Sequence, residues 1–159
     1  MSWLNKNLDS RRVFINTIEE INDSKNIIVV CDVGFSYVDD TKLKVFNFGV
    51  TEASSTITSA ALGLSGYTVW FYSMINFVTF RVHEMIRNGI VQHKADVKII
   101  GVKGSEKYKF LGFSHNLLWE DEEIEWMQKL MPCYKPKMEE VRDLILKLDK
   151  EKGASYIRL

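Results

Sequence analysis

The chain has 159 residues, and 46% of them are hydrophobic, which is enough to build one domain with a sizeable core. Its 21 Lys and Arg residues balance 21 Asp and Glu residues, so it lacks the basic field that nucleic-acid binding requires. No apolar run is long enough to span a bilayer, and no signal peptide is evident at the N-terminus. We therefore expect a soluble cytoplasmic protein that binds neither nucleic acid nor membrane.

Helical and extended patterns alternate along the sequence. In chain order they predict a helix at 10–22, strands at 27–31 and 44–48, a helix at 52–65, a strand at 67–72, a helix at 76–89, a strand at 97–102, a long loop at 103–119, a helix at 121–129, a strand at 131–134, a helix at 136–150 and a strand at 155–159. This alternation predicts a three-layer α/β fold with a mostly parallel sheet of about six strands.

Individual residues support these boundaries. Asp9 or Ser10 can cap the first helix, Thr51 can cap the second, and Gly66 follows the end of the second helix. The β-branched run at 27–31 is typical of a parallel strand that is buried on both faces. Its Cys31 is expected to be a small buried hydrophobe in a reducing compartment.

Chemically useful side chains recur where the predicted strands end. Asp32, Ser36, Glu52, Met74, Phe77 and the loop with His115 all fall at carboxyl ends, the edge at which parallel sheets bind ligands. The common nucleotide-binding and nucleophile motifs are absent from the sequence. The three histidines are too scattered to predict a metal site.

Four short segments give a more specific indication. They are Phe-Gly-Val-Thr-Glu at 48–52, Ala-Ala-Leu-Gly-Leu at 60–64, Ser-Met-Ile-Asn-Phe-Val-Thr-Phe at 73–80 and Gly-Phe-Ser-His-Asn at 112–116. In this order they resemble the pyrimidine-binding domain of transketolase-type thiamine diphosphate enzymes, which reads Phe-Gly-Ile-Ala-Glu, Ala-Ala-Gly-Leu, Thr-Phe-x-x-Phe and Gly-x-Thr-His-Gln. The resemblance covers nearly the whole chain. It implies that residues 1–159 form a single domain with the thiamine diphosphate-binding fold.

The resemblance gives Glu52 a catalytic and cofactor-binding role. In this family a carboxyl group bonds N1′ of the aminopyrimidine and promotes the imino tautomer, through which the cofactor loses its C2 proton. The alternative is a Glu in the first helical turn that interacts with the helix dipole, worth about 0.3–1 kcal/mol.

The same resemblance implies further cofactor contacts. Phe77 matches a residue that packs on the aminopyrimidine, Met74 and Phe80 match its neighbours, and Asp32 ends a strand in the corresponding pocket. The alternatives are core packing for the three apolar residues and helix capping for Asp32. Met74 replaces the usual aromatic residue, but its thioether can still contact a ring face.

Substrate contacts follow from the resemblance as well. His115 matches a histidine that bonds substrate oxygens and so acts in catalysis, and Arg11 and Ser36 match residues that hold the phosphate of a sugar phosphate. Lys103 replaces a second histidine, and Leu111 replaces an aspartate that reads a substrate hydroxyl. These two departures argue against an ordinary ketose phosphate as substrate. The alternatives are an exposed loop residue for His115 and a solvated first-turn residue for Arg11.

The sequence lacks the Gly-Asp-Gly…Asn motif with which this family binds Mg²⁺ and the diphosphate. The resemblance therefore implies a split transferase of carbohydrate metabolism, active only with a separate diphosphate-binding subunit and assembled with two copies of each chain. It would transfer a two-carbon ketol or acyl unit between sugar-type substrates. One alternative is the small subunit of a split 2-oxoacid decarboxylase, and another is a non-catalytic flavodoxin-like binding module with Asp32 at a strand end.

Overall fold

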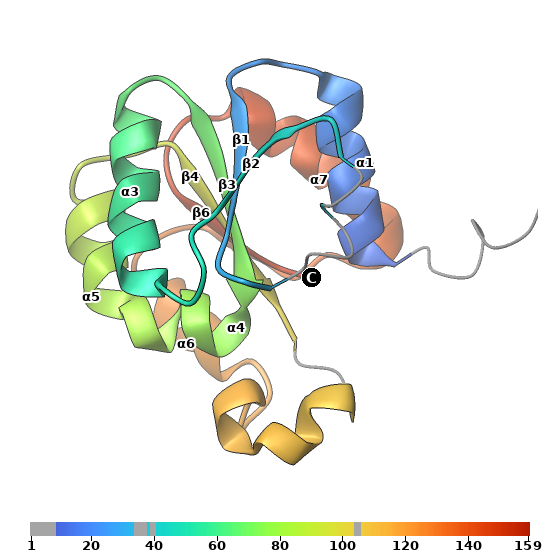
Figure 1. Cartoon of the computed structure of the whole chain (residues 1–159), viewed down its shortest axis with the longest axis vertical. Coiled ribbons are helices and arrows are strands. Elements are labelled where there is room, and N and C mark those ends of the chain that lie inside the picture. The colour runs from blue at the N-terminus through green and yellow to red at the C-terminus, as the bar shows by residue number, and fades with distance from the viewer. Residues whose placement is uncertain (1–8, 34–37, 39–40, 104–105) are drawn as a thin grey trace, which may run out of the picture.

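The computed structural model describes residues 9–33, 38, 41–103 and 106–159. A six-stranded sheet forms its centre (Figure 1), in the order β2-β1-β3-β4-β6-β5. All neighbouring strands pair in parallel, as the sequence predicts. The strands are β1 (Asn26–Val30), β2 (Lys44–Asn47), β3 (Thr68–Met74), β4 (Val97–Val102), β5 (Cys133–Tyr134) and β6 (Ser155–Arg158).

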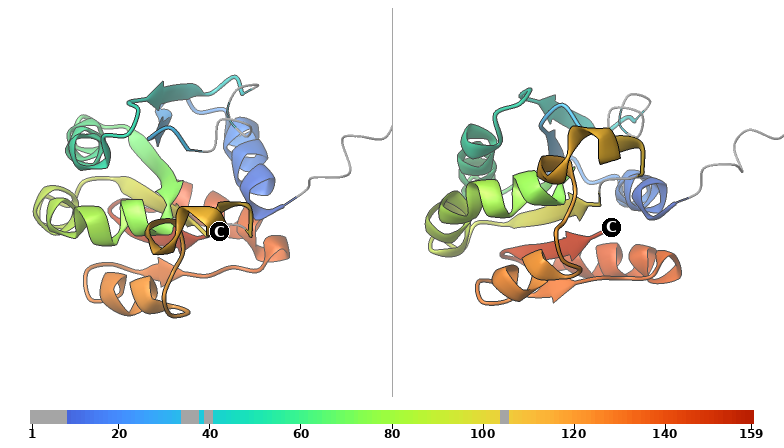
Figure 2. Two further views of the ribbon diagram at one scale, coloured as in Figure 1. Left: turned by 60° about the horizontal axis from the view of Figure 1, so that its bottom comes forward. Right: turned by 90° about the horizontal axis from the view of Figure 1, so that it is seen from below.

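The helices cover both faces of this sheet (Figure 2). They are α1 (Ser10–Ile21), α3 (Glu52–Leu64), α4 (Ile75–Val78), α5 (His83–Met85), α6 (Glu122–Met127) and α7 (Met138–Lys150). Shorter 3-10 turns occur at Phe80–Val82, Glu106–Leu111 and Phe113–His115, and a π-helical turn occurs at Ile86–Val91. None of the described helices is long and apolar enough to cross a membrane.

Two apolar cores follow from the alternation of side chains along the strands. On one face, residues such as Ile28 and Tyr72 pack with α1 and α7 around Phe14. On the other face, residues such as Val29 and Phe71 pack with α3, α6 and the helical segment that follows β3. Since the central strands are buried on both faces, the continuous apolar runs of the sequence are accounted for.

The predicted ends of α1 and α3 are confirmed to within one residue, but the prediction that Thr51 caps α3 is wrong. Asp9 caps α1, because its carboxylate accepts hydrogen bonds from the backbone N–H groups of Arg11 and Arg12. Thr51 precedes α3 but does not cap it, since its hydroxyl donates instead to the Phe48 carbonyl at 2.9 Å. Gly66 follows α3 with a φ of +95°, which favours glycine.

The single helix predicted at 76–89 is wrong. The structure breaks it after α4, where Thr79 has φ −122° and ψ −84°, and continues it as short 3-10, α and π turns. The buried Thr79 hydroxyl donates to the Ile75 carbonyl at 2.7 Å, a local bond that competes with the regular helical ladder. This break sets the position of the two residues that follow, Phe80 and Arg81.

The strand order also bears on the flavodoxin-like alternative. A flavodoxin-like sheet has the order 2-1-3-4-5, whereas here β6 lies between β4 and β5. The two folds therefore differ at this edge of the sheet.

Candidate functional site

A cavity of about 600 Å³ opens at the carboxyl ends of the strands, which point downward in Figure 1. It lies where the strand order reverses, because β2 and β3 flank β1 on opposite sides. Open parallel sheets bind ligands at this position. The cavity is lined by Arg11, Cys31, Asp32, Val33, Val50, Glu52, Tyr72, Met74, Phe77, Arg81, Val102, Lys103, Tyr108 and His115.

Most of the candidate residues named from the sequence meet in this cavity. Those that line it are Arg11, Asp32, Glu52, Met74, Phe77, Lys103 and His115. Phe80 does not line it, but contributes to a smaller neighbouring cavity with Phe113 and Leu118. Ser36 lies outside the described residues. Among the described residues, no group of three or more His, Cys, Asp or Glu side chains is placed to hold a metal ion.

Glu52 is the most buried charged group of the cavity. It is the first residue of α3, and only 3% of it is exposed. Its Oε2 accepts a hydrogen bond of 2.9 Å from Nη1 of Arg81. The neighbouring Cys31 thiol is buried as well, and burial raises its pKa, to which the charge of Glu52 adds.

Arg81 lines the cavity but is not among the residues predicted from the sequence. Besides its ion pair with Glu52, its guanidinium carbon lies 3.9 Å from the centroid of the Phe77 ring. Phe77 and Arg81 are four residues apart, a spacing that makes side chains neighbours in a continuous helix such as the one predicted at 76–89. A cationic side chain four residues after Phe77, the ring predicted to contact a ligand, is the sequence signal from which Arg81 could have been identified.

Phe77 forms the aromatic wall of the cavity. It follows Met74, the last residue of β3, and both side chains are buried. The His115 ring meets the Phe77 ring edge-on, with centroids 5.0 Å apart. Tyr108 stacks on the histidine, with centroids 6.3 Å apart. The loop at 103–119 therefore brings two further rings to the cofactor candidates.

Asn76 fastens this loop to α4. Its side-chain amide donates to the carbonyls of Phe113, Ser114 and Asn116, at 3.0 to 3.1 Å. Ser114 in turn bonds Nδ1 of His115 at 3.0 Å. A side chain from the motif that carries Phe77 thus holds the motif that carries His115, so the two predicted motifs are mechanically joined.

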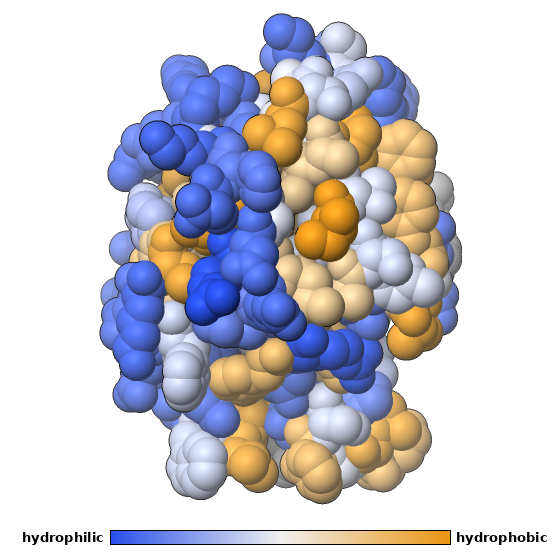
Figure 3. Space-filling model, turned by 90° about the vertical axis from the view of Figure 1, so that its left-hand side faces the viewer, coloured by the Kyte–Doolittle hydropathy of each residue, from blue (hydrophilic) through white to orange (hydrophobic). Residues whose placement is uncertain are grey.

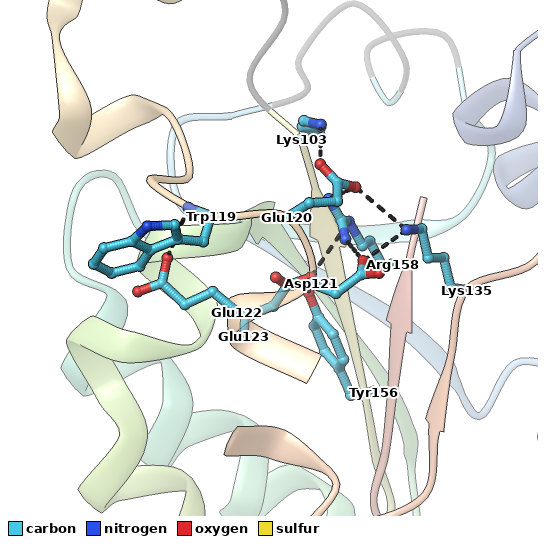
Figure 4. A network of polar contacts seen from close by, with 9 residues as sticks. All are labelled: Lys103, Trp119, Glu120, Asp121, Glu122, Glu123, Lys135, Tyr156 and Arg158. Carbon is cyan, nitrogen blue, oxygen red and sulfur yellow. Dashed lines mark hydrogen bonds and ion pairs between the residues drawn. The ribbon is translucent and has the colours of Figure 1, made fainter. Parts of the chain in front are cut away.

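Lys103 is held by an acidic residue at the far end of the same loop. Its ammonium donates to Glu120 at 2.7 Å, and Arg158 of β6 donates to the same carboxylate at 2.8 Å (Figure 4). The hydrogen bond from Lys103 leads the contacts that lower the pKa of Glu120 to about 2. Arg158 also pairs with Asp121. This network fixes both ends of the loop to the sheet.

Arg11 and Asp32 lie on the side of the cavity formed by α1 and β1. Arg11 is not a freely solvated residue, because it pairs with Asp9 at 2.6 Å. Asp32 lies two residues after the end of β1 and adopts a left-handed backbone with φ +56°. Its backbone N–H donates to the side chain of Asn47 at 3.0 Å, which ties the end of β1 to the end of β2.

The geometry fits a planar nitrogen-bearing ring between Glu52 and Phe77. The guanidinium of Arg81 is itself planar, stacks on Phe77 and donates from its edge to Glu52. The space between the ring face and the carboxylate therefore accommodates a flat group with nitrogen at its edge. An aminopyrimidine, which has the same two properties, matches the residues present.

No family model and no curated protein matches this sequence. Solved structures do match it. Over 94% of its length the chain is similar to a split-gene transketolase in an inactive β4 tetramer, with a TM-score of 0.79 and 24% identity. It is similar over the same share to a transketolase variant with xylulose-5-phosphate and to a transketolase with sedoheptulose-7-phosphate, both from Pichia stipitis, each with a TM-score of 0.77 and 13% identity.

The lengths of these proteins differ from that of this chain. The chain spans 50% of the split-gene transketolase chain and 25% of each Pichia stipitis chain. The resemblance drawn from four short segments is confirmed by the agreement of the whole fold. The chain thus has the fold of a transketolase domain.

Proposed function

We propose that this chain is the pyrimidine-binding subunit of a two-chain, thiamine diphosphate-dependent transketolase-like enzyme. The observation that carries the proposal is the buried carboxylate of Glu52, linked through Arg81 to the face of the Phe77 ring at the carboxyl ends of the strands in a transketolase-type fold. When bound, thiamine diphosphate would supply the carbon nucleophile and the electron sink for the transfer.

Glu52 and Phe77 have separate roles in this proposal. The Glu52 carboxyl would hold a hydrogen bond at the edge of the aminopyrimidine, while Phe77 would contact its face, with Met74 beside it. Burial of Glu52 keeps competing water from that hydrogen bond and makes it stronger than it would be in solvent. Phe80 and Asp32 contribute less, because Phe80 lies outside the cavity and the Asp32 side chain is exposed.

The polar residues around the cavity suit a sugar-type substrate. His115 lines it beside Tyr108, and Arg11 and Lys103 line it with positive charge. Imidazole can donate to or accept from a hydroxyl, and the two cations suit a phosphate group. The solved transketolases that hold xylulose-5-phosphate and sedoheptulose-7-phosphate support a sugar-type substrate for this chain. Lys103 and Leu111 argue that this substrate is not an ordinary ketose phosphate.

The proposal includes a separate subunit that binds the diphosphate and Mg²⁺. The chain spans only part of its structural neighbours, and it exposes apolar side chains on β2, on α3 and between them: Phe46, Phe48, Val50, Ile57 and Leu64. Apolar side chains gather on the face of the molecule around α3 (Figure 3). Such patches are typical of protein interfaces. The stoichiometry of two copies of each chain and the cytoplasmic location stay predictions.

The test is to co-express the chain with the product of a neighbouring gene that carries the Gly-Asp-Gly…Asn motif. Thiamine diphosphate and Mg²⁺ binding to the purified complex is measured by calorimetry, and ketol transfer is measured with sugar phosphates. We expect Glu52→Gln to lower turnover by about 10²–10⁴-fold, the contribution of a positioned proton donor or acceptor. Glu84→Gln is the matched control, because Glu84 is exposed and outside the cavity. Normal turnover by Glu52→Gln would contradict the proposal.

A further inference from the structure

The side chain of Arg81 makes both contacts that the proposed function assigns to the aminopyrimidine. It stacks on Phe77, 3.9 Å from the ring centroid, and it donates to Glu52 at 2.9 Å. We propose that Arg81 is an internal competitor, which holds the aminopyrimidine site closed until the cofactor displaces it. This inference rests on the proposed function and adds a form of regulation to the same site.

The two occupants exclude each other. Arg81 covers the face of the Phe77 ring, and His115 contacts that ring edge-on, at 5.0 Å between centroids. Phe77 is otherwise buried, so a ring that stacked on it from the cavity would need the space of the guanidinium. The guanidinium would also have to leave Glu52, because its hydrogen bond to Oε2 holds it between the carboxylate and the Phe77 ring.

Arg81 can leave this position more easily than Glu52 can. The Arg81 side chain is 43% exposed, whereas the Glu52 side chain is 3% exposed at the start of the regular helix α3. Arg81 also lies in the 3-10 turn Phe80–Val82, next to the non-helical backbone of Thr79. Rotation of one long side chain into water is therefore enough to open the site, since water solvates the guanidinium.

Closure by Arg81 raises the apparent dissociation constant of the cofactor by a factor that depends on how often the site is open. The apparent dissociation constant equals the intrinsic constant divided by the open fraction, so a site open one time in ten binds about tenfold more weakly. The rate of association would also level off at high cofactor concentration, because the side chain must open before the ring can enter.

The test compares the wild-type complex of both subunits with Arg81→Ala and Arg87→Ala complexes. Calorimetry gives the dissociation constant of thiamine diphosphate with Mg²⁺, and stopped-flow tryptophan fluorescence gives the association rate. We expect Arg81→Ala to bind about tenfold more tightly, with a rate that stays linear in cofactor concentration. Arg87→Ala should match the wild type, because Arg87 is exposed, lies outside the cavity and contacts Asn88.

A second measurement reports on Arg81 without any cofactor. Nitrogen NMR of the arginine guanidinium groups in the full chain should show hindered rotation of the Arg81 group, which Glu52→Gln releases. Free rotation in the wild type would overturn the proposal that Arg81 competes with the cofactor. Unchanged or weaker cofactor binding by Arg81→Ala would overturn it too. Either result would leave the proposed function standing. Failure of both the wild-type and the Arg81→Ala complexes to bind cofactor would overturn the proposed function, and this inference with it.

Discussion

Two buried carboxylates, one at the amino ends of the strands and one at their carboxyl ends, are paired in different ways. At the amino ends of the strands, Asp96 accepts hydrogen bonds from Lys98 at 2.8 Å, from Lys152 at 2.9 Å and from the Thr68 hydroxyl at 3.0 Å. At the carboxyl ends, Glu52 accepts one side-chain hydrogen bond within the described part of the chain, from Arg81 at 2.9 Å. The first carboxylate is saturated by its own fold, whereas the second depends on a single, partly exposed donor.

The cations that bond these two carboxylates also differ, because one is buried and fully hydrogen-bonded and the other is partly exposed. Lys98 is 1% exposed and uses all three of its protons, on Asp96 and on the carbonyls of Glu151 and Gly153. Arg81 is nearly half-exposed and can exchange its partner for water. A saturated pair of buried charges stabilises the fold, while an exchangeable pair beside a cavity is suited to binding. The predictions below test this distinction.

The largest expected effect is the loss of Lys98. Lys98→Met leaves Asp96 buried without its main partner, and removal of one member of a buried pair costs about 3–5 kcal/mol of unfolding free energy. Urea unfolding of the chain measures this loss. Lys152→Met is the control, because Lys152 reaches the same carboxylate from a side chain that is 70% exposed and should cost no more than about 1 kcal/mol. Equal losses for the two variants would contradict the distinction.

Acid should reduce the stability that the Asp96 carboxylate contributes through its bonds to Lys98 and Lys152. Burial pushes the pKa of Asp96 upward, but hydrogen bonds from Lys98 and Lys152 outweigh it and hold that pKa below its usual 3.8. Because the folded-state pKa is the lower one, this carboxylate contributes stability above pH 3.8, and the contribution is lost as the pH falls through the folded-state value. In unfolding measurements from neutral to acid pH, Asp96→Asn should therefore lose less stability than the wild type over that range. A steeper loss in Asp96→Asn would contradict this sign.

At the cavity, removal of a charge should cost little stability. Glu52→Gln keeps the shape of the side chain, and Arg81 stays in contact with water, so we expect a loss of at most about 1 kcal/mol. The same urea experiment measures it, next to Lys98→Met. A loss as large as that of Lys98→Met would show that Glu52 is a structural group rather than a ligand-binding one.

The smallest effect on stability is expected for Lys103. Its pair with Glu120 is more than half-exposed on both sides, so Lys103→Ala should change the unfolding free energy by less than about 1 kcal/mol. It should nevertheless raise the pKa of Glu120 from about 2 toward 4.5, because the hydrogen bond from Lys103 is the main cause that lowers it. An NMR titration of the Glu120 carboxyl carbon measures the shift. No shift would mean that Lys135 and Arg158 hold this carboxylate without help from Lys103.

The fold and much of the cavity could be predicted from the sequence because both follow from local rules. β-Branched runs such as residues 27–31 form parallel strands, and the carboxyl ends of parallel strands meet at one edge. That rule is enough to bring Glu52, Phe77 and His115 together from distant parts of the chain, as the structure shows.

The remaining features depend on contacts that no local pattern specifies. The break at Thr79 arises where a buried hydroxyl bonds the preceding turn, and it leaves Phe80 outside the main cavity. The pairing of Arg81 with Glu52 joins residues of two separate helical segments. Asn76 bonds three carbonyls of a loop some 40 residues away, a set of contacts that requires the folded loop. Tertiary packing, rather than propensity, decides all three.

The central claim is that Glu52 binds the aminopyrimidine of thiamine diphosphate at this edge of the sheet. The most direct measurement is a crystal structure of the chain in complex with its diphosphate-binding subunit, thiamine diphosphate and Mg²⁺. We predict that the Glu52 carboxyl will lie within hydrogen-bonding distance of a pyrimidine nitrogen, with Arg81 turned away from Phe77. A bound cofactor whose ring lies elsewhere, with Arg81 still paired to Glu52, would contradict the account.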